Sequence, residues 1–92
     1  MFEKVLIAED FDTINLAVAQ VLGDMDVKQV AHAKYCDDAL LKIKKALFEA
    51  QPYDLLISDL SFKDDFRQVT ITTGEALIQQ VRMLQPDIPV IV

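Results

Sequence analysis

Two short apolar runs, each followed directly by acidic residues, are the features that most constrain the fold of this sequence. Residues 5–8 (VLIA) precede Glu9 and Asp10, and residues 55–58 (LLIS) precede Asp59. Continuous apolar runs of this length are typical of parallel strands that are covered on both faces. Because ligands bind beyond the carboxyl ends of such strands, these carboxylates are the first candidates for a functional site.

The chemistry of this site follows from the charge of its members. If the two strands are neighbours, Glu9, Asp10 and Asp59 converge on one point. Such a cluster repels itself unless it takes up protons or a cation. Hard oxygen ligands in this number suit Mg²⁺. We therefore predict a magnesium site at this edge of the sheet.

Helical patterns alternate with strand patterns along the whole chain. We expect strands over residues 5–8, 27–31, 54–58 and 88–92, and helices over residues 13–22, 37–50 and 72–84. This alternation predicts an α/β fold with a parallel sheet and right-handed crossovers.

The helix ends and inward faces can be predicted residue by residue. Asp12 is expected to cap the first helix and Gly23 to end it, while Thr72 and Glu75 form a capping-box pattern before the third. The expected inward residues are Ile14, Ala17, Val18, Val21 and Leu22 in the first helix, Leu40, Leu41, Ile43, Leu47 and Phe48 in the second, and Leu77, Ile78, Val81 and Leu84 in the third.

Composition narrows the class of protein. The chain has 92 residues, enough for one domain, and 52% of them are hydrophobic. A net charge of −6 argues against nucleic-acid binding by this chain, since phosphate contacts need clustered Lys and Arg. We expect no membrane span and no signal peptide. Cys36 is the only cysteine, which fits a reduced, cytoplasmic setting.

Three pieces of the sequence together resemble the receiver domain of two-component response regulators. They are residues 5–10 (VLIAED), 54–60 (DLLISDL) and 86–92 (PDIPVIV), and the interval from Asp10 to Asp59 also fits. The resemblance spans the chain, but only about the first four of the family's five β/α units. It implies a flavodoxin-like, doubly wound parallel sheet of strand order 2-1-3-4-5, incomplete at its C-terminus, with residues 1–92 as a truncated receiver domain.

The resemblance also implies roles for individual residues. Asp59 matches the phosphoacceptor, which receives a phosphoryl group from a histidine kinase or phosphotransfer protein. Asp10 matches a direct Mg²⁺ ligand, Glu9 an acidic position acting through water, and Ser61 a ligand through its backbone carbonyl. The implied protein is a signalling domain rather than an enzyme, and its output, transcriptional in many relatives, is outside this chain.

Two departures from the family pattern matter. The chain ends at Val92, before the Ser or Thr and the Lys that contact the phosphoryl group in receivers. We expect the apolar edge of the fourth strand to be exposed, so that the chain either pairs with another chain, with a homodimer through this edge as the candidate, or is cut from a longer one. In addition, a longer polar-aromatic loop over residues 61–72 replaces the usual turn. We expect it to alter access to Asp59 or to contact a partner, and the alternative is a tolerated insertion.

Two other functions are open at this point. One is a pseudo-receiver that binds proteins without being phosphorylated, and the other is a Mg²⁺-dependent phosphatase with an aspartate nucleophile. For the phosphatase, Asp10 would be the nucleophile and Asp12 its partner, but the flanking pattern is missing. We interpret His32 and the lysines at 42, 44 and 45 as solvated side chains.

Overall fold

The computed structural model describes residues 3–58 and 74–92 of the chain. Strands and helices alternate as the sequence predicts. In chain order they are β1 (Lys4–Ala8), α1 (Asp12–Asp24), β2 (Gln29–Ala33), α2 (Cys36–Phe48), β3 (Leu55–Ser58), α3 (Gly74–Leu84) and β4 (Val90–Ile91).

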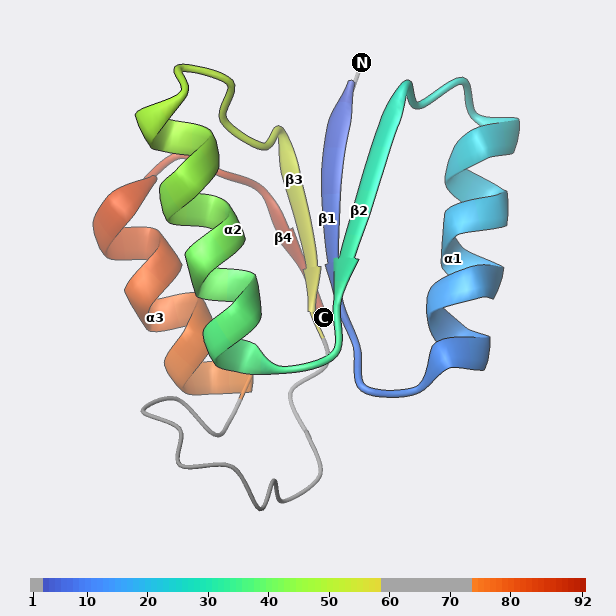
Figure 1. Cartoon of the computed structure of the whole chain (residues 1–92), viewed down its shortest axis with the longest axis horizontal. Coiled ribbons are helices and arrows are strands. Elements are labelled where there is room, and N and C mark those ends of the chain that lie inside the picture. The colour runs from blue at the N-terminus through green and yellow to red at the C-terminus, as the bar shows by residue number, and fades with distance from the viewer. Residues whose placement is uncertain (1–2, 59–73) are drawn as a thin grey trace.

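The strands form one parallel sheet in the order β2-β1-β3-β4. Helix α1 covers one face of the sheet, whereas α2 and α3 cover the other (Figure 1). The chain therefore winds in both directions from β1, and this confirms the predicted flavodoxin-like fold over its first four strands. The carboxyl ends of β1 and β3 lie side by side at the point where the winding direction changes.

Strand β1 is the centre of the molecule. Its residues 5–8 are at most 1% exposed, because β1 pairs with β2 and β3 at its edges and is covered by helices on both faces. Val5 and Ile7 pack with Leu22 of α1, and Leu6 and Ala8 belong to the larger core under α2 and α3. Each fully buried Leu or Ile contributes about 2–3 kcal/mol of apolar transfer free energy.

Asp54 fixes the register of β3 against β1 at the amino ends of the strands. Its Oδ2 atom accepts hydrogen bonds from the backbone N–H groups of Glu3 (2.9 Å) and Lys4 (3.0 Å). Its own N–H donates to the Lys4 carbonyl (2.7 Å). The Lys4 ammonium lies 4.6 Å from the centre of the Tyr53 ring. Burial, and then the nearby Glu49 carboxylate, raise the pKa of the Tyr53 hydroxyl above its ordinary value.

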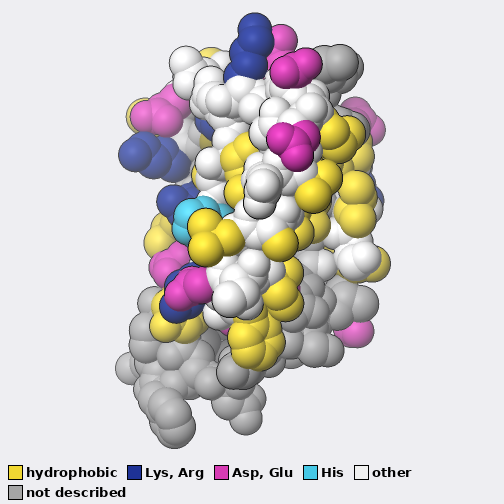
Figure 2. All heavy atoms as spheres, turned by 90° about the vertical axis from the view of Figure 1, so that its right-hand side faces the viewer, with side chains coloured by type: hydrophobic (Ala, Val, Ile, Leu, Met, Phe, Trp, Pro, Cys, Tyr) yellow, Lys and Arg dark blue, Asp and Glu magenta, His cyan; other side chains and the backbone are white. Residues whose placement is uncertain are grey.

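The predicted inward face of α1 is wrong in part. Ile14 and Val21 are 45% and 57% exposed, and Ala17 is exposed too. The face toward the sheet consists of Asn15, Val18, Ala19 and Leu22. Hydrophobic side chains therefore gather on the surface over α1 (Figure 2). Since α1 is apolar on nearly every side, periodicity alone could not select the buried face.

Both predicted termini of α1 also need correction. Phe11, not Asp12, is the N-cap residue, and it makes no side-chain capping bond. Gly23 lies inside the helix, which continues to Asp24. The chain turns at Asp26, whose φ is 63°.

The same C-terminal motif ends α1 and α2. After α1, the N–H groups of Asp26 and Val27 donate to the carbonyls of Gly23 and Leu22. After α2, those of Ala50 and Gln51 donate to Leu47 and Ala46 in the same pattern. This is the Schellman motif, in which a left-handed residue follows the helix. Asp26 and Ala50 occupy that position instead of glycine, which is why no glycine marks the helix ends.

The C-terminal turn of α2 should gain stability from a glycine. Ala50 has φ 58°, and a left-handed conformation costs a residue with a Cβ atom about 1–2 kcal/mol. We expect Ala50→Gly to raise the free energy of unfolding by about 0.5–1 kcal/mol, after the larger backbone entropy of glycine in the unfolded chain is subtracted. Urea denaturation measures the change. The control Ala17→Gly, within α1, should lower the free energy of unfolding by about 1 kcal/mol. If both variants changed the free energy of unfolding in the same direction, this explanation would be contradicted.

Strand β2 begins two residues later than predicted. We expected residues 27–31, but Val27 donates its N–H to Leu22 in the turn after α1 and cannot enter the sheet. The first strand residue, Gln29, donates instead to the Glu3 carbonyl at 2.9 Å. Strand β4 is shorter than predicted, and Ile91 and Val92 are 52% and 72% exposed. Pairing of two copies through this edge stays a prediction.

The inward faces of α2 and α3 were predicted in part. Leu40, Ile43, Leu77 and Val81 are buried as expected. Leu41, Phe48 and Leu84, however, are 62%, 92% and 39% exposed. In α2 the small residues Ala39 and Ala46 lie on the inward face, which they share with Cys36, Leu40 and Ile43. Thr72 of the predicted capping box lies outside the described residues.

Leu40 and Leu41 offer a matched test of the face of α2. They are neighbours of the same type in one helix, but Leu40 is 8% and Leu41 62% exposed. We expect Leu40→Ala to lower the free energy of unfolding by about 2–4 kcal/mol, because it leaves a cavity in the core. Leu41→Ala should change it by less than about 0.5 kcal/mol. Urea denaturation of both variants is the measurement, and comparable losses would show that the helix is rotated from its described position.

Candidate functional site

The candidate site lies at the carboxyl edge of the sheet. The last register pair of β1 and β3 joins Ala8 to Ser58, and both residues are buried. On the other side of β1, the Glu9 N–H donates to the Ala33 carbonyl at the end of β2 (3.0 Å). Three strands therefore end together here, and Glu9 follows the central one directly.

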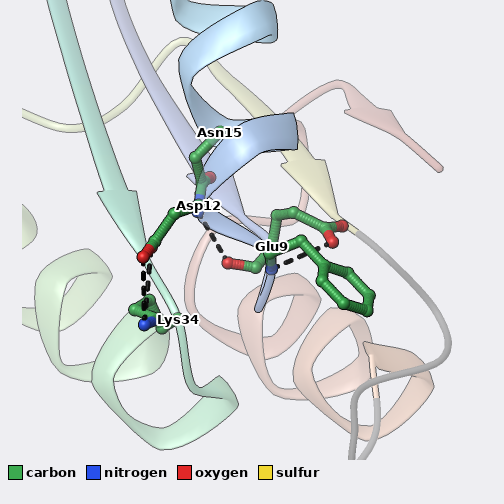
Figure 3. Close-up of polar contacts among 5 residues, drawn as sticks. Glu9, Asp12, Asn15 and Lys34 are labelled. Carbon is green, nitrogen blue, oxygen red and sulfur yellow. Dashed lines mark hydrogen bonds and ion pairs between the residues drawn. The ribbon is translucent and has the colours of Figure 1, made fainter.

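Glu9 is held more tightly than a surface acid would be. The residue is only 7% exposed. Its Oε1 atom accepts a hydrogen bond from the Phe11 N–H at 3.3 Å, which turns the side chain back over its own loop (Figure 3). Its backbone carbonyl accepts a second bond, from the Asn15 side-chain amide at 2.8 Å. Glu9 is thus a fixed, buried carboxylate beside the strand end.

Asp10 follows in the same loop and is half-buried. Its Oδ1 atom is screened from solvent. The structure therefore brings two of the predicted metal ligands, Glu9 and Asp10, to the end of β1. The donor set consists of carboxylate oxygens on a short, ordered turn, which is the chemistry that Mg²⁺ prefers.

The other predicted site residues, Asp59 and Ser61, lie outside the described residues, as does the loop over residues 61–72. Asp59 is the next residue in the sequence after Ser58, the last residue of β3. Within residues 3–58 and 74–92, no group of three Asp, Glu, His or Cys side chains comes together. The predicted carboxylate cluster includes Asp59, so its completion stays a prediction.

Asp12 lies at the rim of the site rather than in it. Its carboxylate pairs with the Lys34 ammonium at 3.4 Å, and the two side chains are 69% and 46% exposed (Figure 3). This contact joins the start of α1 to the residue after β2. An exposed ion pair of this kind contributes about 0–1 kcal/mol.

The residues interpreted as uninvolved lie away from this turn or face solvent. His32 and the lysines at 42, 44 and 45 are exposed. Cys36 is buried at the start of α2. Structural cysteines buried in apolar surroundings are typically unreactive.

Sequence reasoning missed Asn15. This residue is 3% exposed and lies on the sheet-facing side of α1, where an apolar side chain is the usual choice. Its position three residues before Val18 and seven before Leu22 could have indicated the buried face. The tertiary contact that explains it, with the Glu9 carbonyl, could not have been read from spacing alone.

Comparisons with known proteins bear on the fold. No protein-family model matches the sequence, and no curated protein matches it. Among solved structures, the receiver domain of the hybrid histidine kinase CckA has a TM-score of 0.75 and 25% identity, over 95% of this chain and 70% of that one. The chain has the fold of a receiver domain.

A second receiver-type protein gives the same result. Two structures of the chemotaxis response regulator CheY4 of Vibrio cholerae have TM-scores of 0.74 and 0.76, with 27% identity. Each covers 98% of this chain, which spans 66% of the CheY4 chain. The resemblance seen in the sequence is therefore confirmed for the receiver fold. No helix among the described residues is long and apolar enough to span a membrane.

Proposed function

We propose that this receiver-type chain accepts a phosphoryl group on Asp59 in a two-component signalling pathway. The observation that carries the proposal is the adjacency of β1 and β3 at the point where the winding direction changes. This adjacency brings Glu9 and Asp10 to the edge where β3 ends, one residue before Asp59 in the sequence. The donor would be a histidine kinase or a phosphotransfer protein, as the likeness to receivers implies.

In the proposed reaction, a carboxylate oxygen of Asp59 attacks phosphorus. The bond from phosphorus to the donor nitrogen breaks, and an acyl phosphate forms on the receiver. Such a transfer depends more on positioning and charge neutralisation than on covalent help from the protein. The role of the chain is then to present one nucleophilic carboxylate beside a fixed acidic turn.

Glu9 and Asp10 would hold Mg²⁺ at this turn. The likeness to receivers implies that Asp10 would ligate the ion directly and Glu9 through water, and Oε1 of Glu9 already accepts the Phe11 N–H. The carbonyl of Ser61 is the further ligand that the resemblance implies. When bound, Mg²⁺ would neutralise charge on the phosphoryl oxygens. We propose that the phosphorylation state then controls an output carried by other residues or proteins.

Intact-mass spectrometry tests this function directly. The chain is incubated with a small acyl phosphate or phosphoramidate, with and without Mg²⁺. We expect one phosphoryl group to be added to the wild type only with Mg²⁺, and none to Asp59→Asn. Asp87→Asn, which removes an exposed carboxylate before β4, should behave as wild type.

Two results would contradict the proposal. Addition that persists in Asp59→Asn would place the acceptor elsewhere. No addition to the wild type at any Mg²⁺ concentration, and none to a version extended past Val92 with the family's Ser or Thr and Lys, would favour a pseudo-receiver that acts by binding alone.

A further inference from the structure

A buried amide occupies a position of α1 where an apolar residue would be expected. The sheet-facing residues of this helix are Val18, Ala19 and Leu22, together with Asn15. Asn15 is 3% exposed, and a buried amide costs free energy unless it is hydrogen-bonded. Its Nδ2 atom donates to the Glu9 carbonyl at 2.8 Å, a contact across six residues (Figure 3).

The hydrogen bond from Asn15 to the Glu9 carbonyl also fixes the orientation of the next peptide unit. The Glu9 carbonyl and the Asp10 N–H belong to the same planar peptide unit. On the preceding peptide, the Glu9 N–H is held by the Ala33 carbonyl at 3.0 Å. The backbone is therefore fixed on both sides of Glu9, and the Asn15 bond sets the direction in which Asp10 leaves the strand.

The other end of the same side chain is not satisfied. The Oδ1 atom of Asn15 is buried and has no hydrogen-bond partner among the described residues. An unsatisfied buried acceptor lowers stability. An apolar side chain would avoid that cost, so packing alone does not account for an amide here. Local rules are broken in this way at functional sites.

We propose that Asn15 is the positioning residue of the acidic turn, holding the Glu9–Asp10 peptide so that both carboxylates are placed for Mg²⁺. This inference rests on the proposed function, because it assumes that the turn binds the ion. Asn15 acts through the backbone and does not ligate the ion. Supporting groups around metal ligands typically account for about 10–100-fold in metal affinity.

A Mg²⁺ titration followed by NMR tests the inference without any phosphoryl transfer. The amide signals of residues 9–12 report the dissociation constant, and a thermal melt in EDTA reports stability without metal. For Asn15→Leu we expect a dissociation constant about tenfold higher than wild type, with faster hydrogen exchange of the Asp10 amide. Its melting temperature in EDTA should stay within about 4 °C of wild type. The substitution removes one hydrogen bond, but it also removes the unsatisfied buried acceptor, and the two effects on stability offset each other.

Val18→Ala is the matched control, one turn along the same face of α1. It should lower the melting temperature by several degrees and leave the dissociation constant within about twofold of wild type. If Asn15→Leu does not fold, Asn15→Ala removes the same amide while keeping a good helix former.

The possible outcomes distinguish a failure of the positioning role of Asn15 from a failure of the proposed function. If the wild type binds Mg²⁺ and the Asn15 variant binds it equally well, Asn15 is structural only, while the proposed function stands. If both Asn15→Leu and Val18→Ala weaken binding in proportion to their loss of stability, a positioning role is likewise overturned. If Mg²⁺ shifts no signal of residues 9–12 in the wild type, both the proposed metal site and the proposed role of Asn15 are contradicted.

Discussion

The burial of β1 on both faces is the constraint on which the rest of this structure depends. A strand with four consecutive apolar residues, as at residues 5–8, is covered by helices on both faces and paired on both edges. Val5 and Ile7 meet the α1 side, and Leu6 and Ala8 meet the α2 and α3 side. Because β2 and β3 both pair with β1, the chain must wind outward from it in two directions.

That winding creates the candidate site. The neighbouring ends of β1 and β3 lie at the point where the winding direction changes, and this is where α/β sheets bind ligands. Glu9 lies there as a buried carboxylate whose backbone is bonded on both sides. The same constraint that builds the core therefore also fixes the acidic turn, which is the physical basis of the proposed receiver chemistry.

Helix α1 links core and site through Asn15. The helix carries apolar residues on nearly every side, so hydrophobic burial alone selects its rotation weakly. The bond from Asn15 to the Glu9 carbonyl and the burial of Leu22 turn residues 15, 18, 19 and 22 toward the sheet. Ile14, Val21 and Met25 are left at the surface as a result.

The sequence by itself determined the order of strands and helices, the parallel sheet and the acidic residues at the end of β1, because these depend on local runs and on periodicity. Only the tertiary structure decided the helix faces, the start of β2 and the importance of Asn15. Ala39 and Ala46 lie in the core and Leu41 and Phe48 outside it, since the buried face of α2 is the one that also carries Leu40 and Ile43. The ends of α1 and α2 were set by backbone bonds at Asp26 and Ala50, which residue type did not mark. Asn15 acts across six residues on a backbone carbonyl, and a contact of that kind exists only once the helix is packed.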